Sequence, residues 1–117
     1  MRLISFSLTT PQFKARTKTV TRRKGWLMLQ PGDRLMAVEK GMGLKPGEKV
    51  VRLGEIEVVS MRRELLSGMY EYPQECAREG FADWTVAQFV DLYCKANGGD
   101  QHQIVTRIEY RYVEPKP

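Results

Sequence analysis

The chain has 117 residues, of which 42% are hydrophobic and 28% charged, and its formal net charge is +5. This length fits one domain with one hydrophobic core, and no apolar run reaches the length of a membrane-spanning helix. The short apolar run at the N-terminus does not resemble a signal peptide, and Cys76 and Cys94 lack CxxC spacing, so we expect a cytoplasmic protein with reduced thiols. A single histidine, His102, argues against a histidine-based metal site, and we expect no metal ion or cofactor.

The positive charge is concentrated near the N-terminus. Residues 1–34 contain eight Lys and Arg and one Asp, a net charge of +7, whereas the rest of the chain has a net charge of −2. A surface polarised in this way suits a partner that carries phosphate groups. A basic, well-solvated surface without a specific role is the alternative.

The first predicted elements are two short strands separated by a short helix. Residues 3–6 and 19–23 have the pattern of strands, and residues 11–16 that of a helix. Thr10 is the expected N-cap of this helix. Pro11 follows at the first helical position, where the N–H group that proline lacks would have no partner in any case.

Two turns introduce the next strands. Pro31-Gly32-Asp33 precedes a predicted strand at 34–38, and Lys45-Pro46-Gly47-Glu48 precedes a β-rich stretch at 49–60. Gly54 interrupts this stretch, and we expect a bulge or break there.

Two further helices are predicted in the second half of the chain. Residues 73–79 form a short helix that ends at Gly80, and residues 86–95 form a helix that begins with the capping box Thr85-Val86-Ala87-Gln88. A hydrophobic staple flanks this cap, formed by Trp84 and Phe89.

The last predicted strand, at 104–113, alternates along its whole length. Its even-numbered residues are expected on one face, with Arg107, Glu109 and Arg111 on the other. Several short strands with a few helices predict an α+β domain, consistent with a small twisted barrel flanked by short helices.

The densest polar cluster lies at residues 16–26, where Lys18 and three threonine hydroxyls stand among several other positive charges. Fixed positive charges nearby favour a neutral Lys18 amine, which can then act as a base. A threonine hydroxyl is a poor nucleophile until such a base takes its proton, so Lys18 and Thr21 are a candidate catalytic pair.

The spacing of this pair sets a condition. In one continuous strand Lys18 and Thr21 point to opposite sides, so they converge only if the chain turns or bulges near Lys18. Thr19, Thr21 and Arg23 then share one face. The alternative is a solvated edge strand, where lysines and threonines are common.

Glu79 is the other candidate for chemistry. It lies in the last turn of a predicted short helix, where the helix dipole disfavours a carboxylate, and Gly80-Phe81 adds a turn and an aromatic ring beside it. These surroundings disfavour the charged carboxylate and suit a proton donor. The alternative is an exposed surface glutamate at a helix end.

The ordered motifs of the chain resemble the ASCH family. ASCH proteins carry a Gly-x-Lys-x-x-Thr-x-Arg pattern after the first helix, and the matching residues here are Arg16-Thr17-Lys18-Thr19-Val20-Thr21-Arg22-Arg23. Later segments are similar to phage and bacterial members: Leu29-Gln30-Pro31-Gly32-Asp33, Arg63-Glu64-Leu65-Leu66, Arg78-Glu79-Gly80-Phe81, Trp84-Thr85 and Val105-Thr106-Arg107-Ile108-Glu109. The resemblance spans almost the whole chain and implies a single ASCH domain at 1–117.

This resemblance implies a small PUA-like β-barrel with a positively charged cleft that binds RNA or a modified nucleoside. In the bacterial branch that removes the acetyl group from N4-acetylcytidine, a lysine activates a threonine, the threonine attacks the amide carbonyl, and a glutamate protonates the leaving amine. Those catalytic roles fall on Lys18, Thr21 and Glu79. Arg23 is implied to stabilise the oxyanion or to orient the substrate.

Three functions are open at this stage: a nucleoside amidohydrolase, a non-catalytic RNA-binding module, and a ribonuclease in which Lys18 acts on a 2′-OH. The partner in each case is RNA or a modified nucleoside, with no membrane involved and a monomer favoured. The predicted binding residues are Arg22, Arg23, Lys24, Arg34, Ser5 and Phe6. Core packing is the simpler interpretation of Phe6.

Two departures from the family pattern bear on the activity. Arg16 replaces the family glycine, which affects the turn that lets Lys18 and Thr21 converge. The loop at 39–49, with three glycines, is longer than the amidohydrolase branch needs, and it either covers the cleft or serves another ligand. The resemblance therefore predicts the fold more firmly than the activity.

Overall fold

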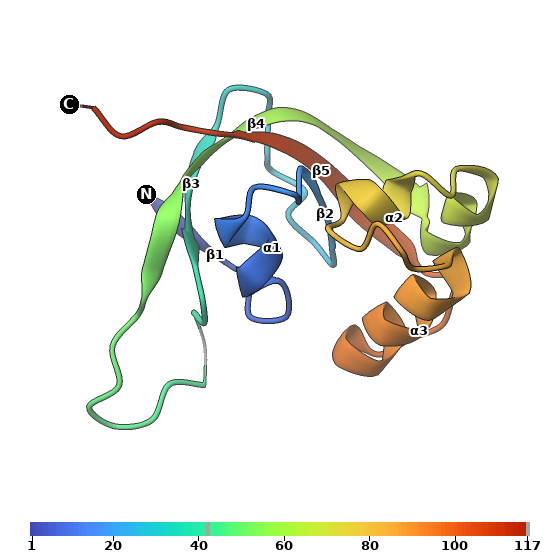
Figure 1. Cartoon of the computed structure of the whole chain (residues 1–117), viewed down its shortest axis with the longest axis horizontal. Coiled ribbons are helices and arrows are strands. Elements are labelled where there is room, and N and C mark those ends of the chain that lie inside the picture. The colour runs from blue at the N-terminus through green and yellow to red at the C-terminus, as the bar shows by residue number, and fades with distance from the viewer. Residues whose placement is uncertain (42, 117) are drawn as a thin grey trace.

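A curled sheet in the shape of half a barrel forms the centre of the molecule (Figure 1). The computed structural model describes residues 1–41 and 43–116, and within them five strands pair in the order β1-β3-β4-β5-β2. The strands are β1 (Arg2–Ser5), β2 (Val20–Arg23), β3 (Arg34–Val38), β4 (Arg52–Leu65) and β5 (Ile104–Tyr112). The predicted α+β class is confirmed at this level, as a small domain of one curled sheet and short helices.

The pairing of the strands leaves β1 and β2 at the two edges of the sheet. β1 runs parallel to β3, and the other pairs are antiparallel. The register between β3 and β4 shifts between Ala37, which pairs with Gly54, and Val38, which pairs with Arg52. The bulge expected at Gly54 is therefore confirmed, and glycine tolerates its φ of 153° there.

Short helical segments cover the sheet, with α2 and α3 grouped away from β3 and the two termini (Figure 1). The segments are α1 (Thr10–Lys14), η1 (Leu66–Glu71), α2 (Glu75–Arg78) and α3 (Val86–Asn97). The capping box predicted for α3 is confirmed, because the Thr85 side chain accepts from the Gln88 amide and the Gln88 side chain accepts from the Thr85 amide. Among the described residues, no helix combines the length and hydropathy needed to cross a membrane.

One local prediction was wrong. The N-cap of α1 is Thr9 rather than Thr10, since the Thr10 hydroxyl donates to the Phe6 carbonyl (2.8 Å) instead of capping the helix. The Trp84 ring packs on Phe81, with ring centroids 4.4 Å apart. The staple between Trp84 and Phe89 stays a prediction.

The hydrophobic core has two parts, and β5 contributes to both. The barrel core includes Ile108 and Tyr110, whereas the helical core, built by η1, α2 and α3, includes Val105. Arg107 is only 4% exposed, although the alternation of β5 puts it on the face opposite Ile108 and Tyr110. The helices α2 and α3 cover that face at this end of the strand, which buries both sides of β5 there.

Candidate functional site

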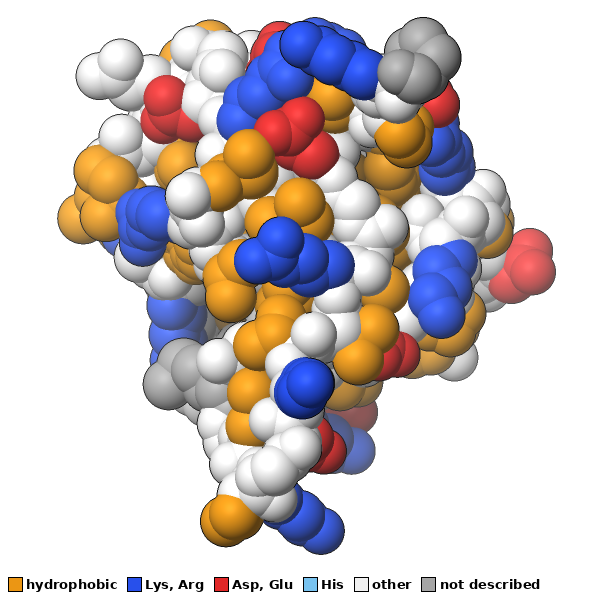
Figure 2. Space-filling view, turned by 90° about the vertical axis from the view of Figure 1, so that its left-hand side faces the viewer, with side chains coloured by type: hydrophobic (Ala, Val, Ile, Leu, Met, Phe, Trp, Pro, Cys, Tyr) orange, Lys and Arg blue, Asp and Glu red, His pale blue; other side chains and the backbone are white. Residues whose placement is uncertain are grey.

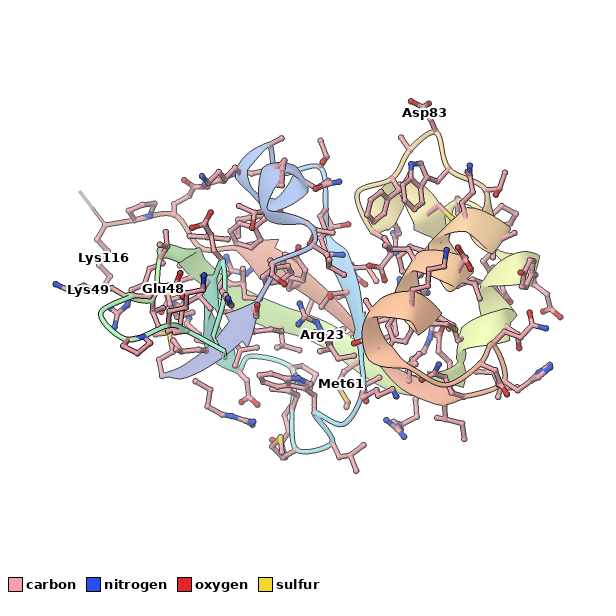
Figure 3. All side chains as sticks on the ribbon, turned by 90° about the horizontal axis from the view of Figure 1, so that it is seen from below. Arg23, Glu48, Lys49, Met61, Asp83 and Lys116 are labelled. Atoms are coloured by element: carbon pink, nitrogen blue, oxygen red, sulfur yellow. The ribbon has the colours of Figure 1, made fainter. Side chains whose placement is uncertain are left out.

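One pocket brings together most of the residues predicted from the sequence. The central pocket, as we call it, has a volume of about 600 Å³, which is in the range of small-molecule sites. Residues 5–9, the segment around β2, the turn after α2, and α3 form its walls. Seven predicted residues line it: Ser5, Phe6, Lys18, Thr21, Arg22, Arg23 and Glu79. Figure 3 shows Arg23 in the region between the sheet and α3.

The chain turns just before β2, which lets Lys18 and Thr21 face the same pocket. Arg16 has a φ of 59°, a left-handed conformation that glycine adopts with less strain, and β2 begins only at Val20. Lys18 therefore precedes the strand, and the two-residue alternation does not apply to it. Arg16, which stands where the ASCH pattern has glycine, makes this turn without glycine. Thr19 is exposed and does not line the pocket.

Two tyrosines of β5 hold the backbone of Lys18 in place. The hydroxyls of Tyr110 and Tyr112 both donate to the Lys18 carbonyl oxygen, at 3.0 Å and 2.5 Å. These bonds tie the segment before β2 to the neighbouring strand. The direction in which the lysine side chain enters the pocket is thereby fixed.

Lys18 and Glu79 form a buried pair in the wall of the pocket. The Lys18 Nζ lies 2.6 Å from the Glu79 Oε1 and also donates to the Glu79 carbonyl oxygen (3.0 Å), and both side chains are at most 3% exposed. Burial lowers the pKa of the Lys18 amine, although the Glu79 carboxylate opposes this change. Burial thus favours the neutral amine, as a base requires.

Glu79 is positioned by the end of α2. It is the C-cap residue of this helix, and its amide donates to the Glu75 carbonyl oxygen (2.9 Å). Gly80 follows with a φ of 98°, and a Cβ atom there would lie 2.8 Å from the Gln12 side chain. The tight turn after α2 therefore requires glycine, and it directs Glu79 toward Lys18.

A network of buried ion pairs, which the sequence did not predict, supports this pair from behind. Arg22 donates to the Glu79 Oε2 (2.9 Å) and to the Glu75 Oε1 (2.6 Å), and Arg107 donates to both Glu75 oxygens (2.6 and 3.2 Å). Glu64 also accepts from Arg22 (3.2 Å). Burial alone would raise the pKa of Glu75, but hydrogen bonds from Arg107 and Arg22 lower it to about 2.

Thr21 and Arg23 lie side by side on the strand. The Arg23 Nε donates to the Thr21 Oγ1 (2.9 Å), and the guanidinium lies over the Phe6 ring, 4.9 Å from its centroid. Burial lowers the pKa of Arg23. Within residues 1–41 and 43–116, no carboxylate forms an ion pair with Arg23. Its two terminal nitrogens are therefore available to an oxygen of a ligand.

The remaining predicted residues have varied surroundings. The Ser5 hydroxyl donates to the Glu39 carbonyl oxygen (3.2 Å) at the rim of the pocket. Lys24 is exposed and does not line the central pocket, and Arg34 lies in a separate hollow of about 680 Å³, where it pairs with Glu55 and Glu57. Figure 2 shows the face that includes β3, where Lys and Arg side chains are interspersed with hydrophobic and acidic ones instead of forming one patch.

The loop at 39–49 contributes Lys40 to the lining of the pocket. Met42, within this loop, lies outside the described residues. The two predicted roles of the loop, as a cover of the cleft or as a site for another ligand, stay predictions.

The helix α3 supplies a wall of the pocket that the sequence analysis did not predict. Phe89, Leu92, Tyr93 and Ala96 line the pocket from this helix. The hydroxyl of Tyr93 is buried, and among the described residues it has no hydrogen-bond partner. An apolar stripe at helical spacing gives no signal for this role, because it looks the same whether it faces a core or a pocket.

The curled sheet with its helical cover defines a small barrel-like α+β domain with one pocket between sheet and helix. The structure described as the crystal structure of hypothetical protein PH0355 has the same fold, with a TM-score of 0.64, 15% sequence identity and coverage of 96% of each chain. No family model and no curated protein matches the sequence. The comparison therefore establishes the fold alone.

Proposed function

We propose that the chain is an ASCH-type domain of PUA-like fold whose central pocket hydrolyses the amide of an acylated nucleoside of the N4-acetylcytidine type. The observation that carries the proposal is the buried contact between Lys18 and Glu79 in the same pocket as Thr21. A base, a hydroxyl and an acid around one pocket are the groups that acyl transfer to a hydroxyl needs.

The first step uses the proton shared by Lys18 and Glu79. When this proton resides on the Glu79 carboxyl, the Lys18 amine is neutral and accepts the proton of the Thr21 hydroxyl. The Thr21 oxygen then forms a bond to the carbonyl carbon of the amide. Burial supports the neutral Lys18 amine, because the charged ammonium loses solvation in the wall of the pocket.

The following steps complete the hydrolysis. The carbonyl oxygen becomes an oxyanion, which the terminal nitrogens of Arg23 stabilise. As the C–N bond breaks, Glu79 gives its proton to the leaving amine, which departs as the nucleoside and leaves the acyl group on Thr21. Water then attacks this ester and gives one proton to the Glu79 carboxylate, while the Lys18 ammonium returns its proton to the Thr21 oxygen. The acyl group leaves as acetic acid, which ionises to acetate, and the Thr21 hydroxyl, the neutral Lys18 amine and the protonated Glu79 carboxyl are restored.

Binding of RNA without catalysis is the second candidate function. The exposed Lys24 amine lies beside Gly98, which directly follows pocket residue Asn97, and it is a cation that a phosphate of a longer chain can reach. Arg22 supports this candidate less, since its guanidinium donates to three carboxylates. The ribonuclease hypothesis stays a prediction, as do the cytoplasmic location and the monomeric state.

The test is a chromatographic assay of N4-acetylcytidine with purified wild type, Lys18→Ala and Thr21→Ala. Wild type is expected to release cytidine, and each variant is expected to lose at least about 100-fold in rate. Thr19→Ala is the matched control, because Thr19 is exposed outside the pocket and its loss should leave the rate unchanged. Intact substrate in the presence of folded wild type would overturn the proposal and direct attention to RNA binding across a salt series.

A further inference from the structure

Tyr93 has an environment that neither the fold nor the proposed hydrolysis explains. Its side chain is 5% exposed and lies on the α3 wall of the central pocket. Its hydroxyl is buried and, within the part of the chain that the structure describes, makes no hydrogen bond. A buried hydroxyl without a partner destabilises a protein by about 1–3 kcal/mol, so such groups usually have a purpose.

The surroundings of the Tyr93 hydroxyl indicate what kind of ligand atom can form a hydrogen bond with it. Phe81, Phe89 and Leu92 line the same side of the pocket as Tyr93. Burial raises the pKa of Tyr93 to about 12, so the hydroxyl is neutral and carries its hydrogen at physiological pH. A hydroxyl that keeps its hydrogen and has no acceptor among the described residues can donate that hydrogen to a ligand in the pocket.

The pocket has two sides of different chemistry, and Tyr93 belongs to the helical one. Lys18, Thr21 and Arg23 belong to the segment around β2, whereas Tyr93 and the apolar side chains belong to the helical side. The amide of an acylated nucleoside must reach Thr21. A flat heterocycle attached to that amide is suited to the apolar side, where its remaining acceptor atoms meet the Tyr93 hydroxyl.

We propose that Tyr93 is a ligand-binding residue whose hydroxyl donates a hydrogen bond to a ring nitrogen or ring carbonyl oxygen of the bound nucleobase. This assignment deepens the proposed function and rests on it for the identity of the ligand. The helix α3 then recognises the base, while the residues around β2 act on its acyl group. An acylated amine without a heterocyclic acceptor is expected to bind weakly.

The experiment measures binding separately from turnover. Thr21→Ala serves as the background, because loss of the nucleophile leaves N4-acetylcytidine intact during calorimetric titration. Adding Tyr93→Phe removes one oxygen and keeps the ring. The dissociation constants of N4-acetylcytidine and cytidine are expected to rise about 5- to 30-fold. Tyr70→Phe is the matched control: Tyr70 lies in η1 with an exposed ring, so this substitution should change neither dissociation constant.

A second measurement separates recognition of the ligand from a structural role. The melting temperature of unliganded Tyr93→Phe should equal or exceed that of its parent, because the substitution removes a buried polar atom without a partner. A fall of several degrees would show that the hydroxyl stabilises the fold, and the inference would then be wrong.

The outcomes also distinguish this inference from the proposed hydrolysis. Equal dissociation constants with and without the Tyr93 hydroxyl overturn the inference even if wild type hydrolyses the substrate. Binding that weakens in Tyr93→Phe supports the inference even if wild type releases no cytidine, in which case the hydrolysis proposal alone fails. Absence of binding by both nucleosides overturns the assignment of Tyr93 to a nucleobase.

Discussion

Replacing Glu75 by glutamine tests whether the buried ion network holds α2 against the sheet. The Glu75 carboxylate accepts from Arg107 and Arg22, which are neighbours across β5 and β2. Glutamine keeps the size of the side chain but removes its charge. Two guanidinium groups that are at most 5% exposed then lose a counter-ion, with Glu64 and Glu79 remaining for Arg22.

Two independent estimates give the size of the effect. A pKa of about 2 for Glu75, against an ordinary value of 4.5, corresponds to about 3 kcal/mol of stability at neutral pH. Removing one partner of a buried ion pair typically destabilises a protein by about 3–5 kcal/mol. A domain of this size has a free energy of unfolding of roughly 6–18 kcal/mol, so the variant should fold, with a melting temperature lower by about 10–20 °C.

The pH dependence gives this prediction a sign. Because the pKa of Glu75 is lower in the folded state, its stabilisation is complete above about pH 5 and is lost as the pH falls from about 4.5 toward 2. Urea unfolding of wild type and Glu75→Gln should therefore differ fully at pH 7 and less at pH 3. Glu71→Gln, at an exposed position, is the control. A difference below about 1 kcal/mol at pH 7, or one that does not vary with pH, would refute the reasoning.

Three further substitutions test other parts of the structure. Gly80→Ala should lower the free energy of unfolding by about 1–3 kcal/mol, because the new Cβ atom would lie 2.8 Å from the Gln12 side chain and the φ of residue 80 is positive. An unchanged urea midpoint of unfolding would contradict this. Thr85→Ala removes the cap of α3 and should cost about 1 kcal/mol, seen as faster hydrogen exchange in that helix. Tyr110→Phe removes one hydrogen bond to the Lys18 carbonyl and should reduce both thermal stability and the rate of hydrolysis, whereas an unaltered rate would show that Tyr112 suffices.

Local patterns predicted the elements well but not the contacts between them. The strand at 34–38 has the predicted bounds, and the capping box at Thr85 was visible because its signal lies within four residues. The convergence of Lys18 with Glu79 came from a family resemblance and one unusual helix end. Neither the alternation of β5 nor the charge of Arg107 predicts its ion pair with Glu75, which lies 32 residues away in the sequence.

The reason is physical. The burial of Arg107 depends on α2 and α3 folding onto one end of β5, and a two-residue period carries no information about what covers each face. The same holds for Tyr93, because an aromatic residue on the buried face of a helix fits a core and a pocket equally. Sequence patterns therefore identify candidate catalytic residues more readily than residues that stabilise the site or bind the ligand.

The position of β5 between two hydrophobic cores has a consequence for how the molecule opens. Val105 anchors the strand in the helical core, and Ile108 and Tyr110 anchor it in the barrel core. Neither core can come apart without exposing a face of the same strand, so the two halves should unfold as one cooperative unit. The amide hydrogens of β5 are accordingly expected to exchange with solvent only through global unfolding, more slowly than those of edge strand β1.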